Sequence, residues 1–178
     1  MRPMKPPPTP TADACRERAL ALLARRAHSR AELERKLLRA GFPPASIRPA
    51  LDALAAARLV DDRLFAEQLL AEKRETRAWG TARLRLELRK RGVAREIGDE
   101  LLAGPAADPD AELERACEAA SRFLRLRRAR RRPPEEPRRE RAALGRFLAA
   151  RGYDAATCRQ AMERLGRAAA GDDAADAG

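Results

Sequence analysis

The sequence predicts an all-α protein of three tandem three-helix repeats, which form an elongated, curved helical array of right- or left-handed sense. Three observations predict this class. The stretches 29–42, 80–93 and 140–153 align without a gap on one apolar pattern. A longer helical pattern precedes each stretch and a shorter one follows it. No stretch of the 178 residues gives a convincing strand pattern. Repeats of about fifty residues have little core of their own and are stabilised partly by their neighbours.

The shared pattern is an apolar pair four residues apart, followed by a glycine and another apolar residue. The spacing of four places both side chains on one face of a helix. The glycine is expected to end that helix, because glycine adopts the left-handed conformation without strain. The aligned residues are Leu33, Leu37, Gly41 and Phe42 in the first copy, Leu84, Leu88, Gly92 and Val93 in the second, and Leu144, Leu148, Gly152 and Tyr153 in the third.

The middle copy also alternates apolar and charged residues, as a half-buried strand does. Leu86 stands between Leu84 and Leu88 in that alternation. The other two copies carry Arg35 and Arg146 at the position of Leu86. The alternation is therefore not part of the repeat, and we predict a helix.

Residues 11–60 form the first predicted repeat, after a Pro-rich arm at 1–10 that we expect to be disordered. Its first helix is expected over 11–27. Ser29 followed by Glu32 predicts a capping box at the start of the second helix. The predicted core positions outside the shared pattern are Leu20, Leu23, Ala27, Ile47, Leu51 and Leu54.

Residues 61–104 form the second predicted repeat. Asp61 and Asp62 resemble a metal-binding or general-base pair, but they directly precede an apolar helical run that includes Phe65. That place favours an N-cap and a partner for the positive end of the helix dipole. In the next helix Gly80 falls at the N-cap, which places Trp79 and Leu84 at the two positions of a hydrophobic staple.

Residues 105–166 form the third predicted repeat. Asp108 as N-cap and Pro109 at the first helical position predict a long helix to about residue 131. The stretch 130–140 is too rich in proline for a continuous helix and is expected to be an exposed joint. Cys158 falls on a core position of the last helix. Residues 167–178 are expected to form a disordered acidic tail.

The sequence lacks the groups that catalysis and metal binding need. The one histidine, His28, precedes the Ser29 cap, where a staple or surface residue is expected rather than a ligand. Cys15, Cys117 and Cys158 are far apart, which indicates neither a disulfide framework nor a zinc site but reduced thiols. No phosphate-binding GxxxxGK[ST] loop occurs. We therefore expect no enzyme, no cofactor and no metal site.

No apolar run approaches the length of a membrane span, and the Pro-rich arm lacks the apolar region of a signal peptide. We expect a cytoplasmic protein that does not bind membranes. The formal net charge is +11, from 38 Lys and Arg against 27 Asp and Glu. Such a balance favours polyanionic partners, of which nucleic acid is the commonest. Aromatic residues make up only 3%, which argues against stacking on bases but not against phosphate contacts.

Basic residues are concentrated in the middle repeat. Their positive charge is larger than helical pairs such as Glu87 with Arg91 can neutralise. We expect this set to contact a partner or DNA. A second cluster precedes the proline-rich stretch. The first set is Arg74, Arg77, Arg83, Arg85, Arg89 and Lys90, and the second is Arg125, Arg127, Arg128, Arg130, Arg131 and Arg132.

The stretch 58–93 combines a set of features that together are characteristic: Val60, Asp61, Asp62, Phe65, Ala66, Arg74, Arg77, Gly80, Leu84, Leu88, Gly92 and Val93. With these residues the stretch closely resembles the RecX family, the regulators of the bacterial recombinase RecA. Looser resemblance extends over about 14–166. The chain differs from the family pattern in the Pro-rich joint and in Leu69-Leu70, where an aromatic residue is more usual.

The resemblance implies a monomer that lies in the groove of the RecA filament on single-stranded DNA. It implies inhibition of RecA ATP hydrolysis, strand exchange and coprotease activity, and so regulation of recombinational repair and the SOS response. Double-stranded DNA is expected to bind weakly. The alternative is an independent DNA-binding protein of the helix-turn-helix type. The starts of the three second helices, "SRAEL", "GTARL" and "ERAAL", share no base-reading pattern.

Overall fold

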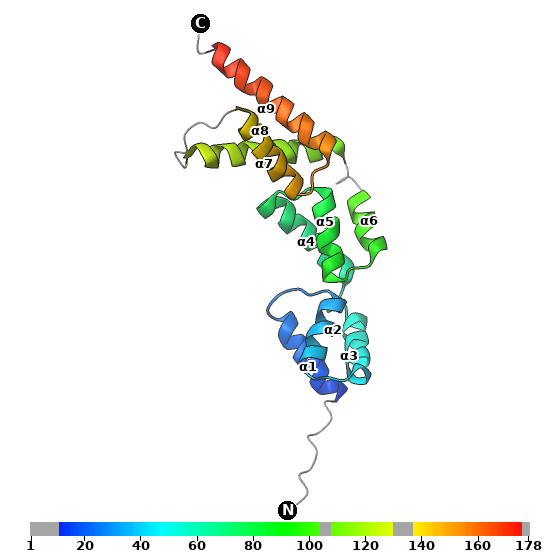
Figure 1. Ribbon diagram of the computed structural model, residues 1–178. Coiled ribbons are helices and arrows are strands. Elements are labelled where there is room, and N and C mark those ends of the chain that lie inside the picture. The colour runs from blue at the N-terminus through cyan, green and yellow to red at the C-terminus, as the bar shows by residue number, and fades with distance from the viewer. Residues whose placement is uncertain (1–10, 104–107, 130–136, 176–178) are drawn as a thin grey trace, which may run out of the picture. The chain divides into compact units, whose positions relative to one another are not determined.

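The structure is a computed structural model that describes residues 11–103, 108–129 and 137–175, with side chains omitted at 128, 137 and 168–175. Every regular element in these ranges is a helix (Figure 1). The all-α prediction is therefore confirmed for the described residues. The helices are α1 (Ala12–Leu23), α2 (Arg30–Arg39), α3 (Pro44–Ala56), α4 (Asp62–Arg77), α5 (Thr81–Arg91), α6 (Arg95–Ala103), α7 (Pro109–Ala129), α8 (Pro137–Ala150) and α9 (Ala155–Ala175).

The chain divides into two compact units. Unit 1 comprises Met1–Glu67 and Leu88–Ile97, and unit 2 comprises Gln68–Glu87 and Gly98–Gly178. The division passes through α4, α5 and α6, so the middle repeat contributes to both units.

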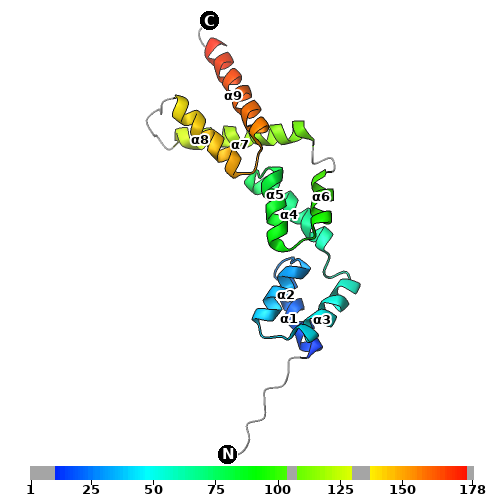
Figure 2. The ribbon, with the colours of Figure 1, turned by 45° about the vertical axis from the view of Figure 1, so that its right-hand side comes forward.

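Unit 1 is built around α1, α2 and α3, which lie together in both ribbon views (Figure 2). Helix α1 ends at Leu23 rather than at the predicted Ala27. The chain leaves the helix there and brings Arg26 and His28 to the Glu32 carboxylate of α2. Leu20 is 40% exposed and so lies outside the core. The buried core residues are Cys15, Ala19, Leu33, Leu37, Ile47, Ala50, Leu51, Leu54 and Val60.

Unit 2 has its core among α7, α8 and α9, each of which contacts the other two. Cys158 is buried there, as predicted. Helix α9 continues to Ala175, into the stretch that we expected to be a disordered tail from residue 167. The prediction rested on the aspartates, whereas the alanines of this stretch have the highest helix propensity of any residue. The buried core residues are Ala116, Ala119, Ala120, Leu144, Leu148, Tyr153, Cys158 and Ala161.

The expected joint at 130–140 is only partly described. Residues 130–136 lie outside the described ranges, and α8 already begins at Pro137. Proline is accepted at the start of a helix because its missing N–H would have no partner there.

The stretch 80–92 forms a helix, α5, and not a strand. It spans Thr81–Arg91, with Leu84 and Leu88 buried at 1% and 2% exposure. Leu86 is 37% exposed. The apolar pair shared by the three copies is therefore the buried one, and the residue outside the repeat faces solvent.

The three aligned glycines end their helices in the same way. Gly41, Gly92 and Gly152 have φ values of 87°, 77° and 85°. The N–H of the next residue then donates back to the carbonyl of the second leucine of each pair, as in the Schellman motif. These bonds run from Phe42 to Leu37, from Val93 to Leu88 and from Tyr153 to Leu148, at 3.2, 3.1 and 3.3 Å.

In unit 1 the glycine end of α5 packs on the start of α2. A Cβ on Gly92 would overlap the Cβ of Ala31. The Ser29 hydroxyl donates to the carbonyl of Arg91 at 2.5 Å. The backbone N–H of Arg30 donates to the Asp62 carboxylate at 2.7 Å. The N–H of Arg30, which has no partner within α2, thus gains one from another repeat.

In unit 2 the glycine end of α8 packs on the start of α5 in the same manner. The N–H of Gly80 donates to the carbonyl of Arg151 at 2.8 Å, and a Cβ on Gly152 would overlap the backbone of Arg83. The N–H and hydroxyl of Thr81 donate to the two carboxylate oxygens of Glu112, each at 2.8 Å. One kind of junction is therefore built twice, with an acidic residue from the following long helix in each.

Candidate functional site

The last turn of α4 carries two of the predicted basic residues, Arg74 and Arg77. Cations at the end of a helix are favoured by its dipole. The Arg77 side chain is exposed, and its backbone carbonyl accepts a hydrogen bond from Arg151 Nε at 3.1 Å. The Arg74 side chain is half-buried, and its Nε and Nη2 atoms are buried without a hydrogen-bond partner.

Arg115 of α7 was not among the predicted residues, but it belongs with Arg74. Its Nε is also buried and without a partner. Burial lowers the pKa of Arg74, the positive charge of Arg115 lowers it further, and Glu112 acts in the opposite direction. The carboxylate of Glu112 meanwhile accepts hydrogen bonds from Thr81. Arg74 and Arg115 are therefore close enough to repel each other, and both have buried donors without a partner.

A hollow of about 710 Å³ lies at these two arginines, between the end of α4 and α7. A second hollow of about 230 Å³ adjoins it, because both are lined by Ala78, Ala119 and Arg122. The charged residues that line the larger hollow are Arg74, Glu75, Arg115, Glu118, Arg122 and Arg125.

The smaller hollow has an aromatic wall. The rings of Phe123 and Phe147 lie 4.3 Å apart between centroids. The guanidinium of Arg151 lies 3.7 Å from the centroid of Phe147, and that of Arg127 lies 5.5 Å from the centroid of Phe123. Burial lowers the pKa of Arg151. Such contacts hold a guanidinium over a ring face without neutralising its charge.

Two of the predicted residues in α5 have protein partners. Arg83 lies over the Trp79 ring, 5.1 Å from its centroid, and Lys73 lies 5.9 Å from the same ring. Arg85 Nε donates to an Asp99 carboxylate oxygen at 2.9 Å. Arg85 is therefore locally compensated, which the alternating sequence pattern did not indicate.

The remaining predicted residues of α5, Arg89 and Lys90, lie in its last turn with exposed side chains. They belong to unit 1, whereas Arg74, Arg77, Arg83 and Arg85 belong to unit 2. The structure thus places the predicted set in two separate surroundings.

The second predicted cluster is described in part. Arg125 is exposed and lines the larger hollow, and Arg127 lies over Phe123. Arg128 lies in α7, although its side chain is not described. Arg130, Arg131 and Arg132 lie outside the described residues.

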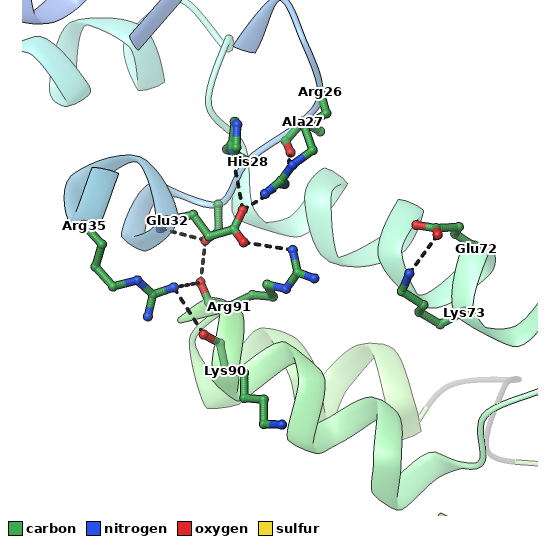
Figure 3. Close-up of polar contacts among 10 residues, drawn as sticks. Arg26, Ala27, His28, Glu32, Arg35, Glu72, Lys73, Lys90 and Arg91 are labelled. Atoms are coloured by element: carbon green, nitrogen blue, oxygen red, sulfur yellow. Dashed lines mark hydrogen bonds and ion pairs between the residues drawn. The ribbon is translucent and has the colours of Figure 1, made fainter. Parts of the chain in front are cut away.

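A buried acidic residue of α2, Glu32, is the centre of a polar cluster that the sequence reasoning missed (Figure 3). Ser29 caps the helix as predicted, with its hydroxyl accepting from the Glu32 N–H at 3.1 Å. The Glu32 carboxylate, however, accepts from Arg26 at 3.0 Å, from His28 Nδ1 at 3.1 Å and from Arg91 at 2.9 Å. The predicted capping box is therefore correct only in its serine half.

His28 lies in this cluster, so of the two expected places, staple or surface, the surface is wrong. Its side chain is 3% exposed and bonded to Glu32. His28 lies before the Ser29 cap and Glu32 lies in the first turn of α2, so their contact reaches across the start of the helix. No sequence pattern indicated that Arg91, 59 residues beyond Glu32, would join them.

Among the described residues, no group of three or more His, Cys, Asp or Glu side chains is placed to hold a metal ion. Cys15, Cys117 and Cys158 are free, and burial raises the pKa of each thiol. No helix within 11–103, 108–129 and 137–175 is both long and apolar enough to cross a membrane.

Over the described residues the fold defines a class, an all-helical protein of tandem three-helix domains. The buried side-chain donors without a partner in these ranges belong to Arg74 and Arg115. Two protein-family models match the sequence. The model described as "RecX, first three-helix domain" matches residues 15–54, and the model described as "RecX, second three-helix domain" matches residues 61–102.

Relatives that match over most of the chain are also RecX proteins. Regulatory protein RecX of Chromohalobacter salexigens is 43% identical over 83% of this chain and 90% of that protein. Regulatory protein RecX of Halorhodospira halophila is 41% identical over 84% of this chain and 86% of that protein. Regulatory protein RecX of Pseudomonas entomophila is 38% identical over 92% of this chain and 94% of that protein. The chain belongs to the RecX family.

Solved structures agree in fold. The crystal structure of RecX from Lactobacillus salivarius has a TM-score of 0.72 at 18% identity, over 87% of this chain and 96% of that one. A crystal structure of regulatory protein RecX has a TM-score of 0.70 at 22% identity, over 85% and 71%. At these identities the likeness concerns the fold.

Proposed function

We propose that this protein binds the filament of RecA on single-stranded DNA and inhibits its ATP hydrolysis, strand exchange and coprotease activity. The observation that carries the proposal is the similarity to proteins named regulatory protein RecX over most of the chain. The net charge of +11 and the exposed cations of α4 and α5 support a partner that carries nucleic acid. In this proposal the protein acts by occupying the RecA filament and not by catalysing a reaction.

The predicted basic residues have different weights in this proposal. Arg77, Arg89 and Lys90 have exposed side chains and are available to a partner. Arg85 is paired with Asp99, so its replacement would disturb that ion pair as well. The exposed three are therefore the better test of the surface.

The test measures ATP hydrolysis by RecA on single-stranded DNA while the protein is titrated in. Wild type is expected to lower the rate, and the triple variant R77E/R89E/K90E is expected to need a much higher concentration. Each exposed contact is weak alone, about 1 kcal/mol or less, so the variant replaces all three.

The matched control is R18E/R25E/R48E, which reverses three exposed arginines outside the predicted set. Co-sedimentation with RecA filaments and with single-stranded DNA alone completes the test. No inhibition by wild type, or stronger binding to DNA alone than to filaments, would favour an independent DNA-binding protein instead.

A further inference from the structure

The larger hollow of unit 2 has the properties of an anion-binding site. Arginine guanidiniums that are buried in proteins almost always have hydrogen-bond partners, because an unsatisfied buried donor is costly. Here the Nε and Nη2 of Arg74 and the Nε of Arg115 have none. These two residues belong to different helices, α4 and α7, and line the same hollow.

The electrostatics of the pair lead to the same conclusion. Arg74 and Arg115 repel each other, since each positive charge disfavours the other. The carboxylates on the rim of the hollow, Glu75 and Glu118, are exposed, and neither bonds the unsatisfied nitrogens. An anion placed between the arginines would satisfy the donors and remove the repulsion.

We propose that Arg74 and Arg115 form a binding site for a phosphate group of the single-stranded DNA backbone, with Arg122 and Arg125 extending the site along α7. The choice of DNA as the source of the anion rests on the proposed function. A guanidinium donates two parallel N–H bonds to a phosphate, which suits the paired donors left unsatisfied here.

A polymer of phosphates fits this site better than one carboxylate of an acidic protein. At a rise of 1.5 Å per residue, Arg115 and Arg122 lie about 10 Å apart along α7, and Arg125 is about one turn further. The hollow of about 710 Å³ is open to all of them. A row of cations is matched by a chain with a charge on every unit, whereas a single side chain neutralises one.

The experiment uses the full chain without RecA and a fluorescein-labelled 30-nucleotide oligodeoxythymidylate, followed by anisotropy. The variant is R74Q/R115Q. The control is R18Q/R48Q, which removes the same charge from exposed positions of unit 1. The R74Q/R115Q variant is expected to bind at least about tenfold more weakly than the control. Equal affinities of the two variants would overturn the site.

A second measurement covers a loss of binding that arises from misfolding. Because the arginines are unpaired, R74Q/R115Q should melt no lower than wild type, and the oligonucleotide should raise the melting temperature of wild type more than that of the variant. R115K keeps the charge but loses the forked donors, so it should bind between wild type and R74Q/R115Q. Wild-type affinity in R115K, or a melting temperature of R74Q/R115Q far below that of wild type, would refute the site.

A competition experiment distinguishes DNA from an acidic protein as the occupant of the hollow. The RecA assay distinguishes failure of the phosphate site from failure of the proposed function. Poly-glutamate should displace the oligonucleotide poorly, and efficient displacement would assign the hollow to an acidic protein partner and overturn the phosphate site. If wild type inhibits RecA ATP hydrolysis while R74Q/R115Q binds DNA like the control, the site fails alone. If R74Q/R115Q loses DNA binding while wild type leaves RecA unaffected, the proposed function fails alone.

Discussion

Glu32 of α2 is the most constrained ionisable residue described here. It is 8% exposed, and burial alone would raise its pKa. Hydrogen bonds from Arg26, His28 and Arg91 outweigh that effect and lower the pKa to about 2. The ionised carboxylate only accepts hydrogen bonds, so the neutral His28 ring carries its proton on Nδ1. The cluster ties the loop before α2 to the end of α5.

Protonation of His28 should destabilise the fold below pH 6.5. Burial lowers the His28 pKa, the bond to Glu32 opposes the shift, and Arg26 and Lys36 add to it. The folded state therefore binds the proton less readily than the unfolded chain, whose histidine pKa is about 6.5. The stability present above that pH is lost as the pH falls below it. Urea unfolding at pH 8 and pH 5 measures the difference.

The matched variant for this prediction is His28→Asn, whose amide can still donate to Glu32 but does not titrate. His28 is the one histidine in the chain, so no other imidazole contributes between pH 8 and 5. The variant should show a smaller loss of stability over this range than wild type. An equal loss in both proteins would contradict the prediction. Both should also weaken as the pH falls from about 4.3 toward 2, because the unfolded chain then binds a proton at Glu32 that the folded state does not.

At the scale of the helix, the three-copy alignment identified the buried pair of α5 although the local pattern favoured a strand. The comparison succeeded because the same core position recurs in each repeat, whereas Leu86 has no apolar counterpart. Replacing Leu84 or Leu88 by Ala should cost roughly 2–5 kcal/mol of unfolding free energy. The same change at Leu86 should cost much less. Similar losses at Leu86 and Leu88 in urea unfolding would contradict the burial pattern.

The helix-ending glycines carry a prediction that separates two causes of destabilisation. Alanine at Gly41 meets no neighbouring atom, so it should cost only the left-handed backbone conformation, about 1–2 kcal/mol. Alanine at Gly92 or Gly152 adds an overlap with Ala31 or Arg83 and should cost about 3 kcal/mol or more. Thermal unfolding of the three variants gives the order.

The control for the glycine series is Gly166→Ala in α9. No atom lies within 4 Å of its added Cβ, and alanine favours the helix by about 1 kcal/mol. It should therefore be neutral or stabilising. A Gly41 variant as unstable as the Gly92 variant would show that the conformation, and not the junction, decides the cost.

At the scale of the whole molecule, the sequence predicted the elements better than their junctions. The glycines and leucines recur, so the helices and their ends could be aligned. The groups that join the repeats differ in type: Ser29 and Asp62 serve one junction, and Gly80 and Glu112 serve the other. The basic residues were likewise predicted only in part. Clusters of arginine indicated residues 74–91, whereas Arg115 lies outside any cluster and was not predicted.

The charge of the whole chain, +11, should make the proposed regulation of RecA depend on salt concentration. Each phosphate contact on a single strand adds about 0.7 to the slope of log affinity against log salt. A protein making about four such contacts should therefore bind about fiftyfold more weakly at 200 mM than at 50 mM salt. The concentration that half-inhibits RecA ATP hydrolysis is the measurement. RecA alone is assayed at each salt concentration, so that its own sensitivity is subtracted. A half-inhibiting concentration that does not change with salt would show that apolar contacts with the filament, and not the cations of α4, α5 and α7, hold the protein there.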